Sequence, residues 1–208
     1  MKSLLSTTLT LCALQTISAI NLPFRPVAHK PQIPVMSEPQ DMLKVPGDNN
    51  ATYGPVPKAE QLLQVEHLSI APSPIPVNKI FFTLLRGEIL PSKRENLPNL
   101  AHLLATATLT ITSSAVLADG THLAPQSYTV PFRTTAFADS AHISIRNRTG
   151  SYVEHFDGTG TNDILSDYWI PGMWLQTGMW TFEVVVKLGD GKCLFAISLT
   201  QWLEKKNL

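Results

Sequence analysis

Histidines and carboxylates are the side chains of this sequence that could do acid–base or metal chemistry, and they are scattered along it. The six histidines lack the close pairs that zinc sites use. His142 and His155, with Asp139 and Asp157 nearby, could meet across neighbouring strands, but no motif supports a catalytic pair there. We interpret these two histidines as exposed residues at strand ends.

Other catalytic patterns are also weak. No Gly-x-Ser-x-Gly elbow occurs, which argues against an α/β-hydrolase. The segment Asp157–Asp163 is rich in oxygen donors but lacks the ligand spacing and terminal Glu of a calcium loop, so we predict a turn. A glycan-active enzyme would need a carboxylate pair such as Asp157 and Asp163 facing one cleft, and this is the least favoured function. The sequence predicts a non-enzyme without catalytic residues, metal or cofactor.

Charge and composition exclude one further class of partner. Sixteen basic residues balance sixteen acidic ones, and no basic block stands out. The electrostatic pattern of a nucleic-acid-binding protein is therefore missing. Hydrophobic residues make up 44% of the chain, which is ample for a core.

The first nineteen residues have the pattern of a secretory signal peptide. Lys2 is followed by a short apolar run, broken by polar residues, that ends in Ser18 and Ala19. The run is well short of the roughly 20 apolar residues of a membrane span, and no other stretch could span a bilayer. We predict secretion to the extracellular space or to a vacuolar or endomembrane lumen. Removing the signal would also remove Cys12, leaving Cys193 as a lone thiol.

Two sequons are credible glycan sites in an exported chain. They begin at Asn50 and Asn147, each followed two residues later by Thr.

Proline frequency separates the N-terminal region from the rest of the chain. Residues 20–57 contain eight prolines without apolar periodicity, which predicts a flexible extension. This extension could serve as a solvated spacer or as a ligand for a proline-binding partner. We place the folded domain at residues 58–208.

Within that domain the apolar pattern has a period of two. Leu109 and Ile111 alternate with threonines, and Trp180, Phe182 and Val184 share one face of a strand that leads into a turn at 189–191. On the return strand Cys193 shares its parity with Phe195, Ile197 and Leu199, which predicts that its thiol is buried. Eight or nine strands are expected, at about 62–70, 80–89, 105–116, 127–135, 142–146, 152–156, 164–170, 180–188 and 193–202. This regular spacing predicts an all-β sandwich.

Several segments, taken in order, resemble the ML family of MD-2-related lipid-recognition domains. They are Val65–Ile70 with the proline-rich stretch 71–76 and Gly87, then Ile170-Pro171, Gly178–Val184 and Leu188–Cys193. The family includes fungal phosphatidylglycerol/phosphatidylinositol transfer proteins and sterol-binding NPC2-like proteins. ML domains usually carry disulfides, and Cys193 has no partner here.

The resemblance implies an immunoglobulin-like β-sandwich whose sheets splay apart to hold an apolar small molecule such as a phospholipid or sterol. It also implies lipid transport, with transient contact with a membrane. By parity the inward-facing candidates are Phe81, Leu85, Leu109, Ile111, Val130, Phe132, Ile143, Ile145, Phe182 and Val184. The apolar loop 168–175 predicts either a pocket rim or a cap on the core.

From these two sets we select pocket or rim candidates, namely Phe81, Leu109, Ile111, Phe132, Ile143, Trp169, Met173, Trp174, Trp180 and Phe182. The alternative is a secreted, non-catalytic interaction or structural protein with a filled core. Such a protein would bind its partner through the 169–175 surface or the proline-rich extension.

Overall fold

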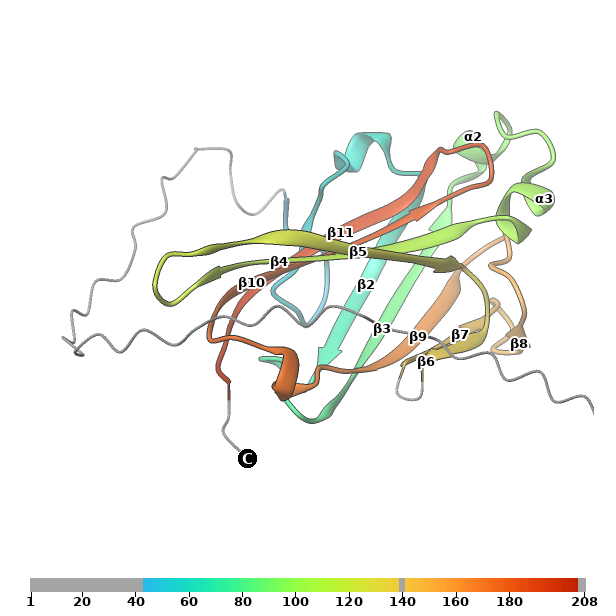
Figure 1. Ribbon diagram of the computed structural model, residues 1–208. Helices are drawn as coiled ribbons and strands as arrows, with labels where there is room; N and C mark the ends of the chain where they lie inside the picture. Colours follow the sequence, from blue (N-terminus) through green and yellow to red (C-terminus); the bar gives the residue numbers. More distant parts are fainter. Residues whose placement is uncertain (1–42, 139–140, 206–208) are drawn as a thin grey trace, which may run out of the picture. The chain divides into compact units, whose positions relative to one another are not determined.

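The computed structural model describes residues 43–138 and 141–205, and within them the chain forms two antiparallel β-sheets. The sheets pack against each other around a shared hydrophobic core (Figure 1). The predicted all-β sandwich is therefore confirmed. None of the helices in this part of the chain is long and apolar enough to cross a membrane.

The five-stranded sheet contains both ends of the described chain. Its order is β1 (Thr52–Tyr53), β11 (Cys193–Leu203), β10 (Gly178–Lys187), β4 (Thr108–Leu117) and β5 (His122–Pro131). The predicted hairpin of β10 and β11 is confirmed, with a turn in which the Gly191 amide donates to the Leu188 carbonyl.

The second sheet has the order β2 (Leu63–Ala71), β3 (Ile80–Ile89), β9 (Asn162–Trp169), β7 (Ala141–Arg146) and β6 (Thr135–Ala138), and β8 (Tyr152–Val153) pairs with β7. Short helices lie in the connections, namely η1 (Lys58–Glu60), α2 (Pro91–Arg94), α3 (Leu100–Ala105) and η2 (Gly172–Trp174).

Burial along the five-stranded sheet falls from the row of Val186 to the row of Phe182. Leu109, Val186 and Phe195 lie in register and are at most 3% exposed. Two rows further along, the inward side chains of that sheet are only partly buried, and they are Ser113, Phe182 and Leu199. The sandwich is thus densely filled at one end and looser at the other.

Aromatic rings fill the dense end. The ring of Phe132 lies 6.0 Å from that of Phe195 and 6.5 Å from that of Phe156. Leu104 of α3 is 1% exposed and belongs to the same core cluster. This end therefore has the close packing of an ordinary protein interior.

The folded domain begins earlier than the sequence predicts. Val45 and Ala51 are fully buried, and β1 pairs with β11. The side-chain amide of Asn49 donates to the Leu68 carbonyl at 2.9 Å, and its oxygen accepts from the Ala51 amide at 2.8 Å. The prediction of a flexible extension up to Pro57 is therefore wrong for residues 43–57. The rest of that extension, the signal peptide and Cys12 lie outside the described residues.

Cys193 is 8% exposed, which confirms its predicted burial. Burial raises the pKa of its thiol to about 11. The thiol is therefore protonated at neutral pH and a poor nucleophile.

Candidate functional site

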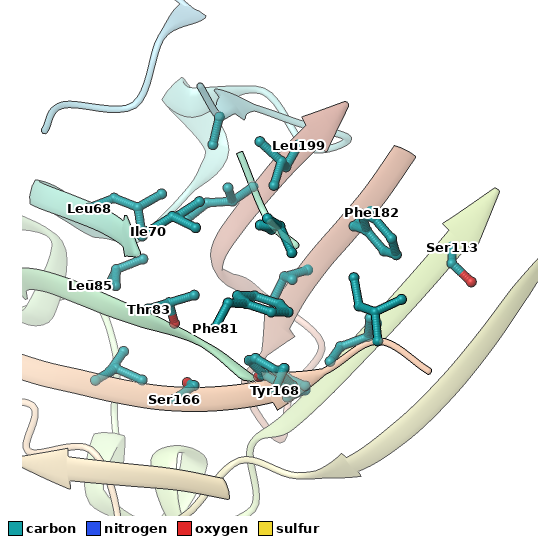
Figure 2. A pocket seen from close by; sticks show the side chains of 18 of the residues that line it. Leu68, Ile70, Phe81, Thr83, Leu85, Ser113, Ser166, Tyr168, Phe182 and Leu199 are labelled. Carbon is teal, nitrogen blue, oxygen red and sulfur yellow. The ribbon is translucent and has the colours of Figure 1, made fainter. Parts of the chain in front are cut away.

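A partly open cavity of about 250 Å³ lies between the two sheets. Side chains of β4, β5, β10 and β11 line it from one sheet, and side chains of β2, β3 and β9 line it from the other (Figure 2). Most of them are aliphatic or aromatic, and the lining residues are Ala51, Leu68, Ile70, Ile75, Phe81, Thr83, Leu85, Leu109, Ile111, Ser113, Tyr128, Ile164, Ser166, Tyr168, Trp169, Ile170, Phe182, Val184, Phe195, Ile197 and Leu199.

Small side chains at inward positions explain why this space is unfilled. Thr83 and Ser166 lie directly opposite each other on β3 and β9, and both line the cavity. Across the gap, Ser113 occupies the inward position on β4. At each of these places a Leu or Phe would reach further toward the facing sheet. The cavity therefore results from the small size of three inward side chains, those of Thr83, Ser113 and Ser166.

Aromatic rings form the walls on both sides of these small residues. Phe81 and Tyr168 stack with ring centroids 5.6 Å apart and an angle of 30° between the planes. Figure 2 shows both rings directed into the space that Phe182 and Leu199 face from the other sheet. Phe182 in turn stacks on Trp180, at 6.2 Å. Flat rings of this kind offer an apolar ligand a large contact area.

Two loops close the looser end of the sandwich. Ile75, in the β2–β3 loop, is 5% exposed, and its amide and carbonyl both bond to the side chain of Gln201, at 3.0 and 2.8 Å. The side-chain oxygen of Asn78 accepts from the Gly172 amide at 2.6 Å, which ties this loop to the β9–β10 loop. Leu175, in the latter loop, is 3% exposed. The β9–β10 loop therefore caps the core, one of its two predicted roles.

The opening lies at the side of the sandwich, between β5 and the end of β9. β7 pairs with β9 only as far as Asp167. Tyr168 and Trp169 therefore extend past the last residue of β9 that pairs with β7. From the opposite sheet, Tyr128 on the edge strand β5 lines the same space. Tyr128 is 46% and Trp169 39% exposed, as expected for residues at a mouth.

The two tyrosines at the mouth lie close enough to influence each other. Burial raises the pKa of Tyr168 to about 12, although a hydrogen bond with the Ser166 side chain opposes that shift. Burial also raises the pKa of Tyr128, and the charge of Tyr168 raises it further. Negative charge is therefore disfavoured at this position.

The polar residues first considered for chemistry lie elsewhere. His142 Nδ1 is 2.8 Å from an Asp167 carboxylate oxygen, and alternation places this pair on the outer face of the sheet. His155 Nε2 is 3.6 Å from a Glu154 oxygen. Among the residues that the structure describes, no group of three or more His, Cys, Asp or Glu could hold a metal ion.

The Asp157 loop forms the predicted turn. The Asp157 carboxylate accepts hydrogen bonds from the amide and hydroxyl of Thr159, at 2.9 and 2.7 Å. Asp163 forms a bidentate ion pair with Arg86, at 2.7 and 3.0 Å. Each carboxylate thus has its own local partner.

Five of the predicted pocket residues line the cavity, namely Phe81, Leu109, Ile111, Trp169 and Phe182. Four others do not line it. Phe132 and Ile143 are each 1% exposed and fill the dense core, and Trp180 packs in a second, smaller cluster beside the cavity. Met173 is 68% exposed and does not line the cavity. The side chain of Trp174 lies outside the described part of the chain.

The polar lining residues were not predicted from the sequence pattern. Thr83 shares its parity with Phe81 and Leu85, and Ser166 shares its parity with Ile164. A small polar residue between two inward apolar residues was therefore the sequence pattern that could have identified these cavity positions. It marks a position where a strand faces the core without filling it.

The two sequons differ in their surroundings. Asn50 is exposed. The side-chain oxygen of Asn147 accepts hydrogen bonds from the Thr149 hydroxyl and amide and from the Ser151 amide. Glycosylation at both sites stays a prediction.

Comparisons with known proteins identify no family. No protein-family model matches the chain, and no curated protein sequence does. Among solved structures it is similar to part of Astrotactin-2, a vertebrate-specific, perforin-like membrane protein involved in neuronal development, with 11% identity and a TM-score of 0.37. The match covers 71% of this chain and 22% of that one, so this chain spans about a fifth of its length.

Proposed function

We propose that this protein is a secreted, non-catalytic lipid-binding protein that holds an apolar small molecule, such as an acyl chain or a sterol, between its two sheets. One observation carries the proposal. The cavity is unfilled by side chains, reaches the surface and is lined mostly by apolar side chains from both sheets. Burial of apolar surface is the main source of affinity in such a site, at about 25 cal/mol per Å².

The size of the cavity limits the ligand. Its volume of about 250 Å³ lies just below the range of about 300–1,000 Å³ that is typical of small-molecule sites. One chain or one compact ring system is the fitting occupant. A phospholipid would place one chain inside and keep the rest of the molecule at the mouth, beside Tyr128 and Trp169.

Exposed apolar side chains near the mouth support transient membrane contact as part of the proposal. Ile80 and Trp169 are paired neighbours on β3 and β9, and they are 47% and 39% exposed. Phe82, on the outer face of β3, is 57% exposed. A ligand with little solubility in water would reach the cavity most directly from a bilayer. Export, predicted from residues 1–19, would place the protein at such surfaces outside the cytoplasm.

Binding of a neutral apolar dye tests the proposal. The protein would be produced in a eukaryotic secretory host, its extract analysed for lipids, and the delipidated protein titrated with N-phenylnaphthylamine. We expect lipid in the extract and saturable dye fluorescence. Thr83→Leu, which places a larger apolar side chain in the cavity, should weaken dye binding by about tenfold or more, because the ligand would have to displace a packed side chain.

Thr200→Leu is the matched control. Thr200 is exposed on the outer face of β11, where its hydroxyl bonds to that of Thr181. The same substitution there should leave dye binding unchanged. A clean extract together with no dye binding, or equal binding by both variants, would contradict the proposal and favour a sandwich that serves as an interaction module.

A further inference from the structure

The polar groups in the cavity are almost all hydroxyls. The lining includes five hydroxyl side chains, and they are Thr83, Ser113, Tyr128, Ser166 and Tyr168. No Lys, Arg, His, Asp or Glu is among the lining residues. Hydroxyls both donate and accept hydrogen bonds, so such a lining can satisfy a neutral polar group of either kind.

These hydroxyls concentrate toward the mouth. Ser166 and Tyr168 are alternate residues of β9 and share a hydrogen bond. Thr83 is the direct partner of Ser166 on β3. Tyr128 approaches Tyr168 from the opposite sheet, close enough for the two to interact electrostatically. A ligand with an apolar body in the cavity would therefore have its polar end next to this group.

The residues that line the cavity offer no charged side chain that could neutralise an ionic headgroup within it. Asp167 lies between Ser166 and Tyr168 in sequence, but its carboxylate is on the outer face, 2.8 Å from His142. An ion moved from water into this environment would lose hydration without gaining a counter-charge. The raised pKa of Tyr168, about 12, shows the same preference for the neutral state at this place.

We propose that the cavity selects uncharged amphiphiles with a single hydroxyl-type headgroup, such as long-chain alcohols, whose oxygen joins the hydrogen bonds of Ser166 and Tyr168. The inference rests on the proposed function and specifies its ligand. Carboxylate and ammonium amphiphiles with the same tail are bound more weakly.

Competition between matched ten-carbon ligands tests this selection. Decanol, decanoate and decylammonium would each displace N-phenylnaphthylamine from the delipidated protein at neutral pH. Decanol should bind about tenfold or more tightly than either ion, because both ions must be desolvated. Equal displacement by decanol and either ion would overturn the inference while leaving the proposed function standing. If the dye does not bind, or no ligand displaces it, the proposed function fails as well.

Hydroxyl deletions identify the residues responsible. Ser166→Ala and Tyr168→Phe should each weaken decanol binding by about two- to tenfold, the effect of one hydrogen bond. Tyr152→Phe is the matched control, since Tyr152 is 62% exposed on β8 and is not among the lining residues. Equal decanol affinity in all three variants would exclude the assigned hydroxyls as the headgroup site.

Discussion

Replacing Ser166 with leucine tests whether side chains leave the space between the sheets unfilled. Ser166 is 8% exposed on β9, and its side chain lines the cavity. Leucine adds three carbon atoms, and their burial is worth about 2 kcal/mol at about 0.8 kcal/mol per methylene. Loss of the hydrogen bond with Tyr168 costs about 1 kcal/mol. We therefore expect Ser166→Leu to stabilise the ligand-free protein by about 1 kcal/mol.

Urea unfolding of the delipidated protein measures this change, provided that the slope of the transition stays constant. Two further variants serve as references for the size of the stability change. Ala107→Leu, at a position 2% exposed in the dense core, should destabilise by about 1–3 kcal/mol through overpacking. Ser144→Leu, on the outer face of β7, should stay within about 0.5 kcal/mol of the parent. If Ser166→Leu loses as much stability as Ala107→Leu, the space is already filled and the reasoning is refuted.

Two further predictions concern the loop at the looser end and the buried thiol. Gln201→Leu removes both hydrogen bonds to Ile75 and should lower the free energy of unfolding by about 1–3 kcal/mol. Hydrogen exchange at the amides of Ile75, Val77 and Asn78 should speed up, and unchanged exchange would contradict this. For Cys193, the ordinary thiol pKa of 9.0 applies when the chain is unfolded, while the folded value is about 11. Stability should therefore fall as pH rises from 9 to 11, because only the unfolded thiol ionises in that window. Urea midpoints across this window should fall less in Cys193→Ala, and an identical fall in both proteins would count against the assignment.

Strand positions and faces could be predicted because successive side chains of a strand point to opposite faces of the sheet. Alternation alone placed Trp180 to Val186 and the returning Phe195 to Leu199 on their correct faces. It failed at Cys193, because a β-bulge sets this residue opposite Lys187. The hairpin between them followed from its Gly-Asp-Gly turn. All nine expected segments overlap observed strands. Such local patterns do not depend on the distance between the sheets.

The cavity depends on that distance, and for this reason the sequence located only part of it. Alternation places Phe132 and Phe182 equally inward, but one packs on Phe156 and Phe195 and the other faces open space. Residues 43–57 were misassigned for a related reason. Their prolines indicate extended chain, whereas burial of Val45 depends on contacts with strands that follow in the sequence.

An apolar occupant would also change the energetics of the whole fold. In protein cores an empty space costs about 24 cal/mol per Å³, which for 250 Å³ is at most about 6 kcal/mol, since this cavity is partly open to water. Domains of this kind have about 5–15 kcal/mol of stability in total. A ligand that restores contacts with Phe81, Tyr168 and Phe182 therefore acts on a large share of that total. We accordingly expect ligand binding to stabilise the sandwich more than any single substitution considered above, because the occupant completes the part of the core that Thr83, Ser113 and Ser166 leave open.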